Sequence, residues 1–342
     1  MGGSAYSKSD YDSRTFLRSS TAKTKGISMK AATFAYTSAI DSGDAPAKVH
    51  DSLSPFKVNR ESRDSKEHPV SVPIGVILDT TGSMAEVPVM IQEKLSHLMG
   101  SFLDDKASGK KYLGDGYPAI LIGAVDDYDA MSGYRSTKGE GSLQVGQFES
   151  GIEIDDNLTN LWLTGNGGGT YSESYNLALY FFARHTVHDH FEKRGRKGYL
   201  FLIGDEHSYE LIKKKEVKDI MGDSIQDDIP LSDILDEVKK RYHVFFIIPN
   251  MTSHYNDPEL EKWWVKRLGQ QNVLKLKDPS KICELIVASV AICEEHIGVD
   301  DLAADLDFDT KALVPLAKAN VEAHAVGGLA PVAGKAGGVE RL

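Results

Sequence analysis

The most informative segment of the chain is Pro73-Ile74-Gly75-Val76-Ile77-Leu78-Asp79-Thr80-Thr81-Gly82-Ser83-Met84. Branched apolar residues fill most of its first half, and an acid and a hydroxyl-rich turn follow directly. A short apolar run that ends in a turn is typical of a strand buried inside a parallel sheet. We therefore expect a strand that delivers Asp79, Thr81 and Ser83 to the edge of the sheet.

These three side chains offer only oxygen atoms to a ligand. Hard divalent cations such as Mg2+ prefer carboxylate, hydroxyl and water oxygens in near-octahedral order. One carboxylate and two hydroxyls at alternate positions of a tight loop can supply three of those oxygens. Mg2+ is the first cation to consider, and Mn2+ is also possible.

Two further oxygen-bearing residues lie downstream. Thr170 ends the glycine-rich stretch Gly165-Asn166-Gly167-Gly168-Gly169-Thr170, and Asp205 follows the apolar run Tyr199-Leu200-Phe201-Leu202-Ile203-Gly204. Ligands of open α/β sheets bind at the carboxyl ends of the strands. Asp79 and Asp205 are therefore expected to meet at the same edge of the sheet. The glycine-rich stretch lacks the lysine of a P-loop, so we interpret it as a loop that brings Thr170 to the cation.

The pattern D-x-T-x-S after the first strand, a threonine on a glycine-rich loop and an aspartate after the fourth strand resembles the von Willebrand factor A domain with its metal-ion-dependent adhesion site. That family usually has D-x-S-x-S, and here Thr81 replaces one hydroxyl by another. The resemblance covers roughly residues 70–297. It implies a Rossmann-like fold and metal-shell roles, direct or through water, for Asp79, Thr81, Ser83, Thr170 and Asp205. It also implies an open coordination position that a partner's carboxylate fills.

Apolar periodicity places further elements between and beyond these motifs. Strands and helices alternate along the chain, which predicts an α/β fold with a doubly wound, mostly parallel six-stranded sheet flanked by helices. The additional strands are expected at residues 119–125, 143–148, 244–248 and 272–276, and the helices at 87–102, 175–182, 211–220, 231–242, 258–268 and 280–295.

The composition divides the chain into three parts. Residues 1–69 carry 11 basic and 8 acidic residues and are expected to form an extended arm or linker, with one amphipathic stretch at residues 28–40. Residues 70–297 form the predicted domain, and residues 298–342 form an Ala- and Gly-rich tail. The densely charged stretch 59–69 has two interpretations: a solvated linker, which we favour, or a docking segment that clamps the arm to the domain or to a neighbour.

Charge and hydropathy exclude several classes of partner. The chain has a formal net charge of −11, and its one candidate for a basic patch is the short run 193–197, which argues against nucleic acid. It contains no apolar stretch long enough to span a membrane and lacks the layout of a secretory signal at its start. Cys283 and Cys293 would lie too far apart on one helix to form a disulfide, which fits a reducing compartment. We expect a cytoplasmic protein, possibly part of a larger particle.

Three other groups of residues are candidates for the site or its surroundings. The acidic stretch 126–129 either holds water around the metal or forms an exposed loop. His185, His188 and His190 lack the spacing and the fourth ligand of a zinc site, so we expect a solvated helix end. Glu206 and His207 lie beside the metal, where they could act as acid and base or simply hydrogen-bond the loop.

The resulting hypothesis is a Mg2+-dependent protein-binding module that coordinates an Asp or Glu carboxylate of a partner, as a subunit of a larger bacterial or viral assembly. No enzymatic activity is expected. One alternative is a metal-dependent phosphohydrolase of the haloacid dehalogenase type with Asp79 as phosphoryl acceptor, but that family needs a second acid where Thr81 stands. The other alternative is a degenerate domain of the same fold that binds partners without metal.

Overall fold

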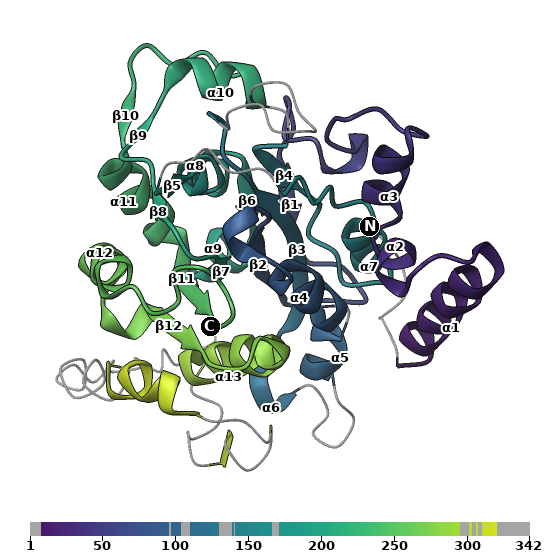
Figure 1. The fold of residues 1–342 in the computed structure, drawn as a ribbon. Coiled ribbons are helices and arrows are strands. Elements are labelled where there is room, and N and C mark those ends of the chain that lie inside the picture. The colour runs from purple at the N-terminus through teal and green to yellow at the C-terminus, as the bar shows by residue number, and fades with distance from the viewer. Residues whose placement is uncertain are drawn as a thin grey trace, which may run out of the picture.

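Figure 1 shows the computed structural model, which describes residues 8–95, 97–103, 110–129, 139, 141–165, 171–294, 301–302, 306 and 310–319. At its centre is a six-stranded sheet with the strand order β12-β11-β7-β2-β3-β4. Every neighbouring pair is parallel except β3 and β4, which are antiparallel. The predicted α/β fold with a mostly parallel six-stranded sheet is confirmed. The strands are β2 (Ser71–Asp79), β3 (Tyr117–Val125), β4 (Leu143–Val145), β7 (Gly198–Ile203), β11 (Tyr242–Pro249) and β12 (Val273–Leu276).

Helices cover both faces of the sheet (Figure 1). One face packs against α4 (Val87–Leu95), α5 (Leu98–Leu103) and α13 (Ile282–Glu294). The other face packs against α8 (Tyr175–Arg184), α10 (Lys214–Met221), α11 (Leu231–Arg241) and α12 (Pro258–Leu268). The central strand β2 contributes side chains to both faces of the sheet. Ile74, Val76 and Leu78 pack on the face covered by α4, α5 and α13, and Ile77 packs on the other face. Buried on both faces, β2 needs the continuous apolar run seen in its sequence.

The remaining short elements connect these layers. They are α6 (Lys110–Leu113), α7 (Glu153–Thr159), α9 (Asp189–Glu192), β5 (Ser172–Glu173), β6 (Thr186–His188), β8 (His207–Ser208), β9 (Leu211–Ile212), β10 (Ile229–Pro230) and 3-10 helices at Asp51–Leu53, Gly82–Met84, Gln270–Asn272, Pro279–Lys281 and Thr310–Leu313. The helix predicted at 211–220 is partly wrong. Its first two residues pair with β10 as strand β9, and α10 begins only at Lys214. The 3-10 helix Thr310–Leu313 lies against β12, with Leu313 fully buried.

The N-terminal segment is helical, which contradicts the extended arm that we expected. It contains α1 (Lys8–Lys25), α2 (Met29–Thr33) and α3 (Ala35–Ser42). Helix α3 docks on the loop that follows α7, because Thr37 Oγ1 donates to Leu161 O at 3.0 Å and accepts from Leu163 N at 2.9 Å. Composition alone could not reveal this docking, since the contacts join residues more than a hundred positions apart.

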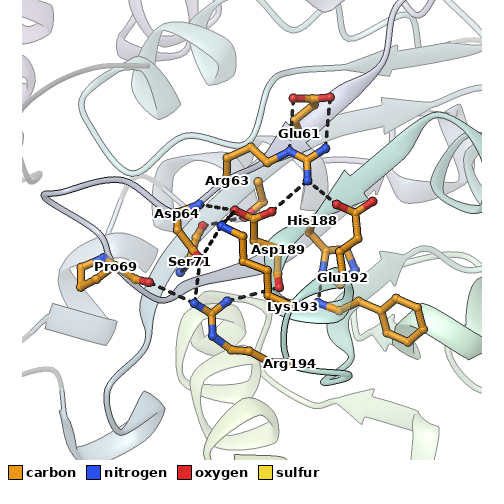
Figure 2. A network of polar contacts seen from close by, with 12 residues as sticks. Glu61, Arg63, Asp64, Pro69, Ser71, His188, Asp189, Glu192, Lys193 and Arg194 are labelled. Atoms are coloured by element: carbon orange, nitrogen blue, oxygen red, sulfur yellow. Dashed lines mark hydrogen bonds and ion pairs between the residues drawn. The ribbon is translucent and has the colours of Figure 1, made fainter.

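The charged stretch 59–69 is a docking segment and not a solvated linker. Its strand β1 (Arg60–Ser62) pairs in parallel with β6. Next to that pair, Arg63 binds Asp189 at 2.9 Å, and Asp64 binds Arg194 at 2.7 Å (Figure 2). Asp189 also accepts hydrogen bonds from Asp64 N at 2.9 Å and Lys193 Nζ at 2.7 Å. The alternating charges therefore form an ion-pair network that ties this segment to α9.

The histidines near this network are buried, so the expected solvated helix end is wrong. His185 is 8%, His188 1% and His190 0% exposed. Burial, together with the positive charges of nearby arginines, lowers the pKa of His188 to about 4 and that of His190 to about 3. Both imidazoles are therefore neutral near pH 7. Spacing could not predict this state, since it depends on what packs around the rings.

Among the helices of the described residues, none has the length and apolar character needed to cross a membrane.

Asp189→Asn should weaken the docking of the charged segment. Burial opposes ionisation of Asp189, but hydrogen bonds from Lys193, Asp64 N and Arg63 lower its pKa to about 2. The native side chain is therefore a charged acceptor near pH 7, and the substitution replaces it with a neutral amide. We expect the free energy of unfolding to fall by about 1–3 kcal/mol in urea titrations. The control is Glu61→Gln, an exposed partner of the same Arg63, which should cost no more than about 0.5 kcal/mol. Equal losses in both variants would contradict this account.

His190→Asn should make the protein less sensitive to acid. Because the pKa of His190 is lower in the folded than in the unfolded chain, the unfolded chain binds more protons at acidic pH. The free energy of unfolding should therefore fall as the pH drops below about 6.5. His190 contributes up to about 1.4 kcal/mol of that loss per pH unit. Urea unfolding between neutral and acidic pH should show a shallower slope for the variant. A slope equal to that of the unmodified protein would refute the prediction.

Candidate metal site

The site begins where β2 ends. Asp79 is the last residue of that strand and its side chain is fully buried. Its Oδ1 accepts hydrogen bonds from Thr81 N at 2.8 Å and from Thr81 Oγ1 at 2.6 Å, which folds the turn back over the strand end. Thr81 Oγ1 lies 3.1 Å from Ser83 Oγ. The three residues of the D-x-T-x-S motif therefore gather their oxygen atoms within one turn.

Asp205 joins this group from the neighbouring strand. Strand β7 pairs directly with β2, in a register that sets Leu78 opposite Ile203. As a result, Ser83 Oγ donates to Asp205 Oδ1 at 2.7 Å. A continuous chain of hydrogen bonds links the side-chain oxygens of Asp79, Thr81, Ser83 and Asp205. It lies at the carboxyl ends of two strands. The fifth predicted residue, Thr170, lies outside the described residues.

Gly204 is required by this close approach. A Cβ atom at position 204 would overlap the hydroxyl group of Tyr175 and lie 3.0 Å from Asp79 Oδ2. Any side chain there would separate β7 from the site.

Tyr175, at the start of the helix predicted over residues 175–182, is a site residue that the sequence did not reveal. It is the first residue of α8, and its hydroxyl group donates to Asp79 Oδ2. Its ring also packs edge-on against Phe246 and Trp264. Burial raises the pKa of the phenol well above its usual value, and the charges of Asp79 and Asp205 add to this effect. Tyr175 is thus a neutral donor fixed in the core.

The electrostatics of the site favour a bound cation. Burial, with a smaller contribution from the charge of Asp205, raises the pKa of Asp79 to about 8, and the hydrogen bonds from Thr81 and Tyr175 oppose this rise. Burial and mutual repulsion make it costly to ionise two fully buried carboxylates, and a divalent cation between them offsets that cost. The donor atoms are all oxygens, which suits a hard cation such as Mg2+. The residues present therefore fit the metal.

More acids surround the site than the motifs indicate. Asp127 is buried and accepts from Tyr209 Oη at 2.8 Å, so the loop after β3 is not the exposed acidic loop that was one of our two interpretations. Glu173, in β5, is 1% exposed, and its carboxyl group is hydrogen-bonded to that of Glu206. Burial raises the pKa of Glu206 to about 7, although its bond with Glu173 opposes this.

The loop after β11 closes the site from a third strand end. His254 N donates to Asp205 Oδ2 at 3.0 Å, and Ser253 N donates to Ser83 O at 3.1 Å. The sequence analysis missed both residues. The end of the fifth predicted strand could have indicated these two residues. Strand β11 pairs with β7, so the loop after β11 must emerge beside Asp205.

A hollow of about 320 Å3 adjoins the site on the side of Thr81 and Gly82. Helices α2 and α3 form one wall of it, through residues such as Ala31 and Phe34. The opposite wall includes Pro88 at the start of α4. The N-terminal segment therefore borders the predicted metal site.

The strand order, the antiparallel edge strand β4 and the acids at the ends of β2 and β7 agree with the arrangement that the resemblance to the von Willebrand factor A domain implied.

Comparisons with known proteins gave distant structural similarities. No family model and no curated protein matches the sequence. Proximal thread matrix protein 1 from the mussel byssus is 13% identical, with a TM-score of 0.37 over 65% of this chain and 48% of that chain. Another structure of it, described with a zinc-occupied MIDAS motif, has a TM-score of 0.36 at 14% identity over the same shares. The pilus adhesin SpaC from Lactobacillus rhamnosus GG has a TM-score of 0.40 at 10% identity, over 68% of this chain and 31% of that chain. The chain thus spans half or less of their length.

Tyr175→Phe should destabilise the metal-free protein by removing the donor to Asp79 Oδ2. A buried acceptor left without its partner costs about 1–3 kcal/mol, so the free energy of unfolding should fall by that amount. The matched control is Tyr180→Phe, on the same helix, whose hydroxyl group donates to the partly exposed Asp223. Chemical denaturation of both variants in chelator should show the larger loss for Tyr175→Phe. The reverse order would contradict the assignment of Tyr175 to the site.

Proposed function

We propose that Asp79, Thr81, Ser83, Thr170 and Asp205 bind Mg2+, and that the bound cation captures an Asp or Glu carboxylate of a protein partner. The observation that supports this most directly is the hydrogen-bonded chain from Asp79 to Asp205. Thr81 and Ser83 would offer hydroxyl oxygens, and the two aspartates would offer negative charge. Mn2+ prefers the same oxygen donors and could replace Mg2+.

The charge of the protein supports an acidic group as the captured ligand. The chain has a net charge of −11, and the site is lined by acids, so an acidic partner would be repelled in the absence of metal. A divalent cation with an open position reverses that repulsion locally. The hollow beside Thr81 can receive side chains that flank the partner's carboxylate, and helices α2 and α3 would then contribute to the choice of partner.

Binding is favoured over phosphoryl transfer. A phosphoryl acceptor must present a carboxylate oxygen to the phosphorus atom. In Asp79, Oδ1 accepts from Thr81 and Oδ2 accepts from Tyr175, and the side chain is fully buried. The second acid of the haloacid dehalogenase pattern is replaced by Thr81. We therefore propose that the protein is not an enzyme.

The proposed organisation is a domain over residues 70–297, with the N-terminal segment 1–69 and the tail 298–342 serving assembly. Cys283 and Cys293 form no disulfide within the part of the chain that the structure describes, in keeping with the proposed cytoplasmic location. Membership of a larger bacterial or viral assembly remains part of this proposal.

Titration calorimetry of Mg2+ into metal-stripped protein tests the function. We expect saturable binding by the unmodified chain and its loss in Asp79→Asn and Ser83→Ala, since each removes an oxygen donor or its charge. The control is Thr80→Val, because Thr80 Oγ1 donates to Val125 O at 3.1 Å and belongs to the same turn but not to the donor chain. Thr80→Val should bind Mg2+ normally.

Retention of the fold in each variant is checked by circular dichroism. A pull-down with and without chelator then reveals whether partner capture needs the metal. Absence of Mg2+ binding in the unmodified chain would favour the degenerate domain that binds without metal.

A further inference from the structure

The two carboxylate oxygens of Asp205 face different neighbours. Oδ1 accepts from Ser83 and belongs to the proposed Mg2+ site. Oδ2 accepts from His254 N at 3.0 Å and lies 3.3 Å from His254 Nδ1. Because a carboxylate can bind two cations through separate oxygens, Asp205 can contribute to a second site on the side of His254.

Glu206 supplies a third donor on that side. Its Oε1 lies 3.8 Å from His254 Nδ1, and single ligand atoms of Asp205, Glu206 and His254 lie within 4.8 Å of one another. The ligand atoms of one ion lie close to one another without being bonded to each other. The spacing of these three residues meets that requirement.

The cluster also has an unsatisfied buried atom. Glu206 is 8% exposed, and its Oε2 is buried with no hydrogen-bond partner among the described residues. His254 Nδ1 likewise makes no hydrogen bond there, despite its short distance to Asp205. A buried carboxylate oxygen without a donor is costly, and a bound cation removes that cost.

The charges nearby do not neutralise this group. Glu173, bonded to Glu206, is 1% exposed and has its own buried Oε2 without a hydrogen-bond partner among the described residues. Asp205, Glu206 and Glu173 thus place three acids beside the single imidazole of His254.

We propose that Asp205, Glu206 and His254 form a second cation site, beside the first, that binds Zn2+ or a similar transition-metal ion. One imidazole nitrogen and two carboxylates are ligands that Zn2+ accepts, and three protein ligands leave a position open. Imidazole is not a ligand that Mg2+ prefers, so the two sites differ in the metal that they select. The second site shares Asp205 with the first but does not require Mg2+ to be bound.

The test is equilibrium dialysis of the full, metal-stripped chain against micromolar Zn2+ in millimolar Mg2+, with both metals measured by mass spectrometry. We expect one Zn2+ per chain. His254→Ala should weaken Zn2+ binding at least about tenfold, whereas Mg2+ binding should persist because the backbone N–H of residue 254 still donates to Asp205. Glu206→Gln should weaken Zn2+ binding as well. The control is His207→Ala, which removes an imidazole adjacent to Glu206 that is not part of the three-ligand group.

Asp79→Asn separates this inference from the proposed function. It should abolish Mg2+ binding and keep Zn2+ binding, since Asp79 belongs only to the first site. If Zn2+ binding survived both His254→Ala and Glu206→Gln, the second site would be refuted, and His254 would be an ion-pair partner of Asp205. If Zn2+ were lost in Asp79→Asn and displaced by Mg2+ in the unmodified chain, it would occupy the first site, which would also overturn the proposal.

Discussion

The structure depends on a fully buried carboxylate at the end of its central strand. Asp79 can remain there only because Thr81 and Tyr175 hydrogen-bond its two oxygens. Those bonds in turn fix the turn after β2 and the first residue of α8, and they leave room for no side chain at Gly204. A single desolvated acid thus sets local structure at three points that are spread over 125 positions of the sequence, from Asp79 to Gly204.

The surroundings of this carboxylate explain why a cation is the natural ligand. Asp205, Glu206 and Glu173 are all buried near it, and their mutual repulsion raises the cost of ionising any one of them. A folded domain can accept this cost if a metal offsets it on binding. Stability and metal affinity are then linked, since whatever binds the folded state more tightly also stabilises it.

The sheet and its polar edge could be predicted from sequence because they are encoded locally. Each buried strand is a short apolar run, and Asp79 and Asp205 follow such runs directly. Tyr175 and His254 could not be found in this way, since their roles arise from contacts with residues 96 and 49 positions away. The docking of the helices near the N-terminus was missed for a related reason. A polar segment gains its structure from the surface on which it docks, as Thr37 does on the loop after α7.

A short element late in the chain lies beside one edge strand of the sheet. Strand β12 is the last strand on its side, and an exposed edge strand offers unpaired backbone groups with which a second chain can pair. The 3-10 helix Thr310–Leu313 packs beside β12 and buries Leu313 in the core. Its contact with β12 restricts the approach of a second strand to that part of the edge.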